Sequence, residues 1–305
     1  MDTQLNVPIL FIFFNRKEIA LQSFAKIKEA KPSKLYLASD GGRDIIPNEK
    51  QRVEDIRNIL LSEIDWDCET KTLFREKNLG CGQGVSTAID WLFENEEMGI
   101  IIEDDVVVHS LFFSFAKTLL IKFKEDDRIG MIAGRNILKK IPSNDSYCFS
   151  KYAATWGWAT WKRAWKNMDY NMGWKNSLYK NNILYNFGYN TKEIKKGLYH
   201  IKLLEKSPNT TWDYQWVLSL AAFNQLCIFP RVNLCANIGG GNEATHTAYV
   251  KQIPVEALEF PLLHPLYIAP DYHFDYLFYR KTNSLLSKIK IILPTWVKKI
   301  SKKIM

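Results

Sequence analysis

Three consecutive carboxylates, Glu103, Asp104 and Asp105, are the most distinctive chemical feature of this 305-residue sequence. They follow the apolar run 99–102, and adjacent acids repel one another, so something must offset their charge. Oxygen-only ligands of this kind suit Mg²⁺ or Mn²⁺, and such an ion is typically shared with substrate phosphates. The alternative is a solvated acidic turn before a helix that begins at Ser110, because acids are favoured near a helix N-terminus.

Polar residues also follow two other apolar runs. Asn15 and Arg16 come directly after the run at 8–14, and Asp40 comes directly after the run at 35–39. Because ligands of an open parallel sheet bind beyond the carboxyl ends of its strands, we expect these groups and the acidic triplet to converge on one edge. The simpler alternatives are a solvated arginine at a helix start and an aspartate that forms a turn before two glycines.

Two later residues complete the set of candidates. Asp213 lies in the hexapeptide TWDYQW, on the first turn of a helix expected over 212–225. An acid at this position either takes part in chemistry or is simply stabilised by the helix dipole. His246 adjoins the glycine-rich stretch 238–245. It is a candidate metal ligand, with a hydrogen-bonded structural histidine as the alternative.

Strand and helix patterns alternate over about the first 135 residues, and these elements have to position the candidates. Apolar runs predict strands at 8–14, 35–39, 71–74, 99–102 and 129–133. Helical spacing predicts helices at 17–30, 49–61, 82–94 and 111–124, the first of them capped by Asn15. This alternation implies an α/β fold with a mostly parallel central sheet and helices on both faces.

Beyond residue 140 the pattern loosens, and no internal repeat or low-complexity stretch appears. We expect one domain over residues 1–279, with an internal boundary near 140. Helix-like spacing predicts that most of a tryptophan cluster is core, because residues four apart on a helix face one side. The members of this cluster are Trp156, Trp158, Trp161 and Trp165.

The net charge of +8 is concentrated in one segment. Residues 280–305 carry eight lysines and arginines and no acid, which leaves residues 1–279 neutral. A nucleic-acid-binding protein spreads its basic residues over a folded face, so we expect no nucleic-acid partner. Apolar residues alternate with the lysines of this tail, and Pro294 breaks any helix there, which excludes a membrane-spanning segment. We expect the tail to contact an anionic membrane surface, unless it forms a helix packed on the domain.

The cysteine pattern bears on the compartment of the protein. Five cysteines are an odd number, and none has CxxC spacing, so neither a zinc site nor a disulfide framework is supported. The N-terminus lacks the charged region of a signal peptide. We therefore expect a cytoplasmic protein, in peripheral contact with the inner face of the membrane through its tail.

Taken in order, these motifs resemble GT-A-fold glycosyltransferases, and the EDD triplet points to the N-acetylglucosaminyltransferase I-like branch. The resemblance rests on PILFIFFNR, LASDGG, the helix at 82–94, IIIEDDVVVHSLFFSF, WGWAT, the segment 161–165 and TWDYQW, and it covers roughly residues 8–220. The stretch NIGGGNEATHT at 237–247 is similar to bacterial members of this broad group. The resemblance implies a GT-A fold, with residues 1–140 binding a nucleotide-sugar donor and residues 141–279 binding the acceptor.

The resemblance also implies roles for the acidic triplet and the strand-end residues. Arg16 and Asp40 match positions that hold a uracil base, which favours UDP as the nucleotide. Glu103 matches a residue that contacts the donor sugar, Asp104 matches the ribose contact, and Asp105 matches the metal ligand.

Two further roles are implied for the later candidates. Asp213 matches the acid that deprotonates the acceptor hydroxyl, a task for a carboxylate on the face opposite the leaving diphosphate. His246 corresponds to a late histidine that many GT-A enzymes use as an additional ligand for Mn²⁺ or Mg²⁺.

The sequence therefore predicts an inverting, Mn²⁺- or Mg²⁺-dependent glycosyltransferase that uses a nucleotide-sugar donor. Its acceptor would be a carbohydrate or a lipid-linked glycan, in glycan or surface-polysaccharide assembly. A retaining transferase on the same fold and a non-catalytic sugar-binding module remain as alternatives. A sugar-phosphate nucleotidylyltransferase is disfavoured, because FFNRKE lacks the glycine-rich loop expected after the first strand.

Overall fold

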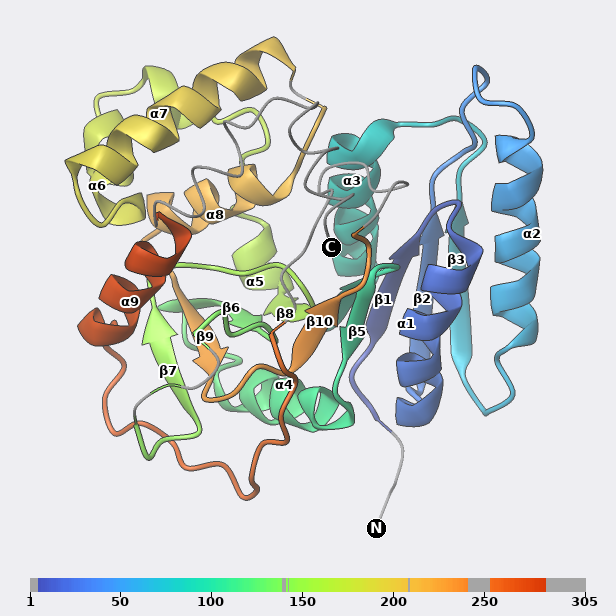
Figure 1. The fold of residues 1–305 in the computed structure, drawn as a ribbon, viewed down its shortest axis with the longest axis horizontal. Coiled ribbons are helices and arrows are strands. Elements are labelled where there is room, and N and C mark those ends of the chain that lie inside the picture. Colours follow the sequence, from blue (N-terminus) through green and yellow to red (C-terminus); the bar gives the residue numbers. More distant parts are fainter. Residues whose placement is uncertain (1–4, 139–140, 142, 208, 241–252, 284–305) are drawn as a thin grey trace, which may run out of the picture.

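The computed structural model describes residues 5–138, 141, 143–207, 209–240 and 253–283 (Figure 1). In this part of the chain, eight strands form one mixed sheet. They are β1 (Ile9–Phe13), β2 (Lys34–Ser39), β3 (Glu69–Phe74), β4 (Met98–Glu103), β6 (Ile129–Ala133), β7 (Tyr147–Ser150), β8 (Trp158–Trp161) and β9 (Leu226–Pro230). Their order across the sheet is β3-β2-β1-β4-β8-β6-β9-β7, so strands from both sides of residue 140 share one sheet.

The first half of the sheet is parallel. Strand β1 pairs in parallel with β2 and β4, and β2 pairs in parallel with β3. Phe11 lies opposite Leu37 on one side and Ile102 on the other, and all three are fully buried. A strand that is covered on both faces has to be apolar throughout, which is why these strands appear as continuous apolar runs in the sequence.

The second half of the sheet is mixed. Strand β8 is antiparallel to both β4 and β6, so β4 and β6 run in the same direction. Strand β9 is parallel to β6, and β7 is antiparallel to β9. The carboxyl ends of β1, β2, β4 and β6 therefore share one edge, and the predicted mostly parallel α/β sheet is confirmed.

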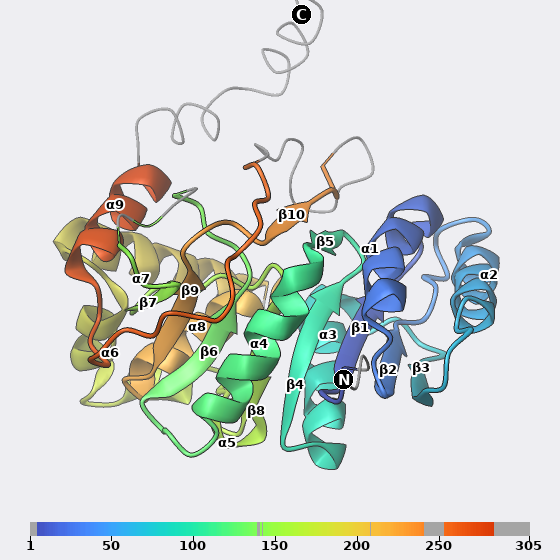
Figure 2. The ribbon, with the colours of Figure 1, turned by 90° about the horizontal axis from the view of Figure 1, so that it is seen from below.

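Helices cover both faces of the sheet, as predicted (Figure 2). One face packs against α1 (Lys17–Ala30), α2 (Glu49–Ser62) and α4 (Ser110–Lys122). The other packs against α3 (Gly80–Asn95), α5 (Lys162–Trp165), α8 (Asp213–Ala222) and α9 (Tyr272–Thr282). The alternation within β1 shows this division, because Phe11 belongs to the first hydrophobic cluster and Leu10 to the second.

A small helical group adjoins α8, beside the second half of the sheet (Figure 1). It consists of the 3₁₀-helix η1 (Gly173–Asn176), α6 (Lys180–Phe187) and α7 (Thr191–Lys206). This group has its own hydrophobic cluster, formed by Met172, Leu184, Ile201, Leu204 and Leu218. A separate two-stranded antiparallel ribbon joins β5 (Val106–Val108) to β10 (Cys235–Asn237), directly after the acidic triplet.

Two local predictions were wrong. Asn15 does not cap α1; its side-chain amide donates to Glu49, 2.6 Å away. Trp158 and Trp161 lie on a strand, β8, and not on a helix, although both are buried as predicted. Backbone pairing of β8 with β4 on one side and with β6 on the other fixes that strand, and no local spacing signal indicates such long-range contacts.

Within the described residues, no helix has both the length and the apolar character needed to cross a membrane. All five cysteines are free thiols. Most of the basic tail, residues 284–305, lies outside the described residues, and so does His246.

Candidate active site

A cavity of about 760 Å³ opens at the carboxyl edge of the parallel strands. Arg16, Asp40, Glu103 and Asp104 all line it, although they belong to different segments of the chain. Glu103 is the last residue of β4, Asp40 directly follows β2, and Arg16 directly precedes α1. The predicted convergence of these four residues is therefore confirmed, and its cause is the common direction of the strands.

Arg16 neutralises part of the acidic triplet. Its guanidinium forms ion pairs with Asp104 and with Asp105, the latter at 3.2 Å. Asp104 is buried and also accepts a hydrogen bond from the backbone N–H of Phe14, at 3.2 Å. Its backbone carbonyl accepts another from the Ser23 hydroxyl, at 2.6 Å. These contacts fasten the triplet to β1 and α1, and so fix the position of its carboxylates.

The triplet still holds excess negative charge. Burial raises the pKa of Asp104 to about 6, against the opposing effect of Arg16. Burial also raises the pKa of Glu103 well above its ordinary range, and the charges of Asp105, Asp104 and Asp213 raise it further. A cation placed beside these carboxylates would lower both pKa values and stabilise the ionised forms.

Asp213 belongs to the same electrostatic cluster, although it lies 110 residues further along the chain than Glu103. The Cys81 thiol lies near the same acids. Burial raises the pKa of the Cys81 thiol to about 12, and the charges of Glu103, Asp213, Asp105 and Asp104 contribute in that order. Cys81 lines the cavity at the start of α3, so the start of α8 and the acidic triplet both lie near it.

A tryptophan cluster holds Asp213 in position. Trp212 and Trp216 flank its helix turn and are buried against Trp158 and Trp165. The Asp213 carboxylate itself is exposed, and it accepts hydrogen bonds from the Thr211 hydroxyl and from the backbone N–H of the next residue. An exposed carboxylate on a rigidly packed helix start can reach a bound substrate without being buried by it.

Asp105 is the candidate metal ligand that lies within the described residues. One carboxylate oxygen accepts from the Asn237 amide at 3.1 Å, and the other faces Arg16. A Cβ atom at Gly239 would lie 2.2 Å from that second oxygen, so only glycine lets the loop approach so closely. Oxygen donors and excess negative charge suit Mn²⁺ or Mg²⁺. No group of three or more acidic, histidine or cysteine side chains forms a cage in the described ranges, so substrate phosphates and water would complete the coordination.

Asp40 has a structural contact that the sequence did not suggest. Its carboxylate accepts from the backbone N–H groups of Leu79 and Gly80, at 2.8 and 3.0 Å. It thereby satisfies two donors at the start of α3, which a helix leaves unpaired. Burial raises its pKa. Asp40 consequently caps a helix and lines the cavity at the same time.

Sequence reasoning missed part of the cavity wall. Glu49 is buried, and its carboxylate accepts a hydrogen bond from Arg43 Nε at 2.8 Å and another from the Asn15 amide. The Arg43 guanidinium lies over the Phe14 ring, 5.6 Å from its centroid. Arg75 donates to the carbonyl of Gly84, at 3.2 Å. These residues come from a loop, a strand end and the first position of α2, and they have no periodicity. No pattern in the sequence therefore distinguishes them from ordinary surface charges.

Arg135 was also missed. It follows β6 at the same sheet edge, and its guanidinium lies 3.5 Å from the centroid of the Trp156 ring. Burial lowers its pKa to about 10. No acidic residue in the described part of the chain forms an ion pair with it. A half-buried cation without an acid partner is a candidate contact for an anionic group of a substrate.

No family model matches the sequence, and no curated protein matches it. Among solved structures, the chain is similar to the mannosyltransferase PcManGT from Pyrobaculum calidifontis, in complex with GDP-Man and Mn²⁺, with a TM-score of 0.44. The identity is 10%, over 79% of this chain and 59% of that one. Residues 1–349 of TarS from S. aureus give a TM-score of 0.42 and 10% identity, over 77% of this chain and 60% of that one.

A third similar structure is HddC from Yersinia pseudotuberculosis. Its TM-score is 0.31 at 10% identity, over 52% of this chain and 77% of that one. The present chain thus spans less than two thirds of the length of the first two structures.

Proposed function

We propose that this protein is a metal-dependent glycosyltransferase that moves a sugar from a nucleotide-diphosphate donor to a carbohydrate or lipid-linked glycan. The observation that carries the proposal is the meeting of Arg16, Asp40, Glu103 and Asp104 around one cavity. The charge of Asp213 acts on Glu103 at the edge of this group. In this proposal the candidate base, Asp213, comes from α8, and the candidate metal and donor residues come from the strand ends. Two chemically separate tasks, activation of a nucleophile and stabilisation of a leaving group, need this kind of division.

The donor nucleotide would occupy the cavity between the strand edge and the start of α3. Arg16, Asp40 and Phe14 line it and offer a cation, a carboxylate and an aromatic face. The resemblance of the first two to uracil-binding positions favours UDP. Asp40 keeps acceptor capacity beyond its two backbone contacts, because a carboxylate has about four lone-pair positions.

Asp105 would hold the divalent ion together with the donor diphosphate. When bound, the ion would neutralise the negative charge that grows on the leaving diphosphate. Arg16 would keep Asp104 ionised and oriented while Asp105 turns toward the metal. His246 is proposed as an additional ligand on the strength of the resemblance alone, because it lies outside the described residues.

Asp213 would remove the proton from the acceptor hydroxyl as that oxygen attacks the anomeric carbon. In an inverting transfer the attack comes from the face opposite the diphosphate, so the base and the metal have to lie on opposite sides of the donor sugar. Asp213 comes from α8 and Asp105 from the loop after β4, so separate elements would supply the base and the metal ligand. The inverting mechanism itself is proposed from the resemblance.

The first test is a thermal-shift panel of nucleotide-sugars with Mn²⁺ or Mg²⁺, followed by a donor-hydrolysis assay. We expect one uridine diphosphate sugar to stabilise the protein only when the divalent ion is present, and to be slowly hydrolysed. Asp127→Ala, which removes an exposed remote acid, is the matched control. Stabilisation without hydrolysis or transfer would indicate a binding module, and a product that retains the donor configuration would replace the inverting mechanism.

We also propose that the basic tail, residues 280–305, contacts anionic lipid at the inner face of the membrane. Each lysine near such a surface contributes about 1 kcal/mol. Flotation of the full chain and of residues 1–283 with acidic liposomes tests the proposal. Equal flotation of both would overturn it.

A further inference from the structure

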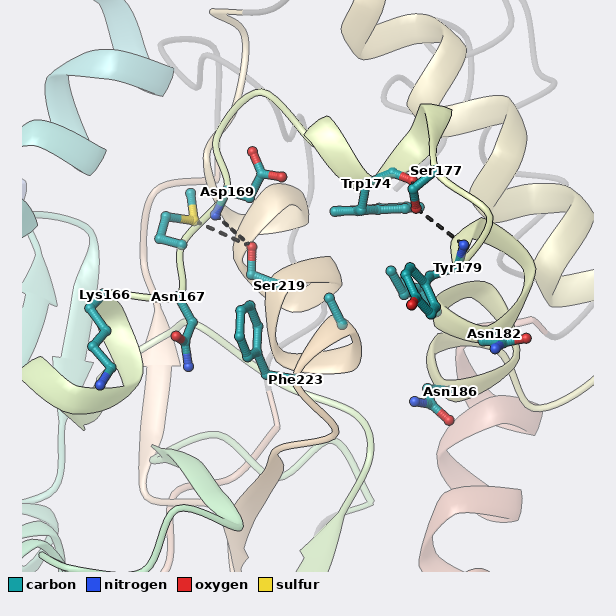
Figure 3. Close-up of a pocket in the computed structure, with 13 residues that line it drawn as sticks. Lys166, Asn167, Asp169, Trp174, Ser177, Tyr179, Asn182, Asn186, Ser219 and Phe223 are labelled. Carbon is teal, nitrogen blue, oxygen red and sulfur yellow. Dashed lines mark hydrogen bonds between the residues drawn. The ribbon is translucent and has the colours of Figure 1, made fainter.

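A second cavity, of about 540 Å³, lies beside the helical group and shares no lining residue with the first. Figure 3 shows Ser219 and Phe223 of the α8 region between Lys166 and Asn167 on one side and Trp174 and its neighbours on the other. The α8 region thus forms the floor. The segment after α5 forms one wall, and η1 with the start of α6 forms the other.

Exposed aromatic rings are the first notable feature of this second cavity. Tyr179 is 69% exposed and Phe223 is 55% exposed, and both line the cavity together with Trp174. The indole Nε1 of Trp174 is buried and has no hydrogen-bond partner among the residues that the structure describes. Aromatic faces that are not covered by the protein's own core offer flat apolar surfaces to a ligand.

Unpaired side-chain amides are the second feature. Asn167 and Asn182 stand on opposite walls, and neither amide forms a hydrogen bond within the described residues. Asn186 donates to the carbonyl of Ala221 at 3.2 Å and keeps its oxygen free to accept. An amide both donates and accepts, so several of them around one cavity match a ligand with many hydroxyl groups.

The charge of the lining excludes a strongly anionic ligand. Of the side chains that line the cavity, only Lys166 and Asp169 carry a charge, and their charges are opposite. The Asp169 carboxylate also accepts from the backbone N–H of Gly173, at 2.6 Å. No arginine contributes, in contrast to the four arginines around the first cavity. Aromatic faces with neutral amides are suited to the apolar face and the hydroxyl groups of a neutral pyranose ring.

The second cavity is joined to the candidate base by one helix. Asp213 begins α8, and Ala222, which lines the second cavity, ends it. At about 1.5 Å per residue, the two ends are about 14 Å apart. The segment that lines one wall continues to Tyr170, whose hydroxyl lies 3.4 Å from the Asn209 amide oxygen beside the start of α3. A short oligosaccharide could span from Asp213 to the second cavity.

We propose that the second cavity binds a neutral sugar ring of an oligosaccharide acceptor, several sugar units from the hydroxyl that reacts at Asp213. The proposal rests on the proposed function for its assignment to the acceptor, although sugar binding by the cavity can be measured without any transfer. It assigns the acceptor class: a glycan of several units and not a single sugar.

The test is saturation-transfer NMR with methyl glycosides of glucose, galactose, mannose and N-acetylglucosamine, and with their linear tetrasaccharides, in the absence of donor. We expect at least one of these neutral saccharides to bind. The double variant Tyr179→Ala, Asn182→Ala and the single variant Asn167→Ala remove contacts from opposite walls. Each should weaken binding by about tenfold or more.

Tyr185→Ala is the matched control, because Tyr185 is a 68% exposed tyrosine of α6 that does not line the cavity. Its saccharide affinity should stay within about twofold of the wild type. Absence of binding by every probe, or equal binding by wild type and both wall variants, would overturn the proposal. Binding of an alkyl detergent, and of none of the sugars, would identify the second cavity as a site for apolar ligands. That result would overturn the proposal as well.

A kinetic measurement separates this proposal from the proposed function. With a tetrasaccharide acceptor, the wall variants should raise the acceptor KM about tenfold and leave kcat and the donor KM unchanged, as expected for a remote binding contact. A protein that binds saccharide in the second cavity but transfers no sugar would contradict the proposed function alone. A protein that transfers sugar with an unchanged acceptor KM in both variants would contradict the second cavity alone.

Discussion

The two cavities of this protein are built on opposite principles. The first lies where parallel strands end, and it is lined by arginines and acids, of which Glu49 and Asp104 are buried. The second lies between helices, and it is lined by exposed rings and unpaired amides. Charge has to be concentrated where a metal and a diphosphate are handled, whereas a neutral sugar needs flat surfaces and many weak hydrogen bonds. This difference agrees with the two proposals, in which one site carries out the reaction and the other holds the substrate.

Acids with raised pKa values also differ between the two halves of the chain. Glu103 and Asp104 have raised pKa values within a cluster of like charges that faces a cavity. Asp275 of α9 is buried too, and burial raises its pKa to about 6, but it accepts a hydrogen bond from the Ser150 hydroxyl and lines neither cavity. A raised pKa therefore marks a candidate site only where the group faces open space.

The largest expected effect is at Asp105. Asp105→Ala should abolish sugar transfer and the Mn²⁺-dependent part of UDP binding, because the ion contributes several kcal/mol to leaving-group stabilisation. Calorimetry with UDP and Mn²⁺, together with a transfer assay, measures both. Asp127→Ala should retain both properties. Full activity of the wild type after treatment with a chelator would contradict the metal assignment.

Asp213→Asn should lower kcat by about 10²–10⁴-fold, the usual contribution of a general base. The affinity for UDP and Mn²⁺ should stay nearly unchanged, because the carboxylate of Asp213 comes from a different element than the donor residues. Steady-state kinetics with both substrates measure the split. A near-normal kcat would remove Asp213 from the mechanism.

Asp275→Asn should change the pH dependence of stability. The pKa of Asp275 is raised in the folded state, so its stabilising contribution is present below about pH 4 and is lost as the pH rises through about 6. The variant should therefore gain about 1–3 kcal/mol relative to the wild type between pH 4 and pH 8. Urea unfolding at both pH values measures the difference. An equal difference at both would show that the carboxyl titrates normally.

Asp40→Ala should destabilise the fold by about 1–2 kcal/mol, because it removes the acceptor for two backbone N–H groups at the start of α3. Asp44→Ala is the control, since Asp44 is an exposed acid whose ion pair with Lys50 contributes little. Urea unfolding distinguishes the two variants. A variant that is as stable as the control but fails to bind UDP would make Asp40 a ligand contact without a structural role.

The sequence predicted the first cavity far better than the second. Strands covered on both faces have to be apolar, so the runs before Asn15, Asp40 and Glu103 could be recognised and their carboxyl ends placed on one edge. Arg135 and Glu49 could not be found in this way, because their importance depends on which loops meet around them. The second cavity has even less of a signature, since exposed tyrosines and asparagines are ordinary on a helix surface. The division into donor and acceptor halves, and the role of His246, stay predictions.

By itself, the sequence determined the α/β class, the order of strands and helices over its first half, and the meeting of Arg16, Asp40 and the acidic triplet. Local apolar patterning and the direction of parallel strands fix these features. Only the tertiary structure decided that Asp213 interacts with Glu103, that Asp40 caps α3, and that Trp158 lies on a strand. Each of these depends on contacts between residues far apart in the chain, and long-range packing leaves no periodic trace in the sequence.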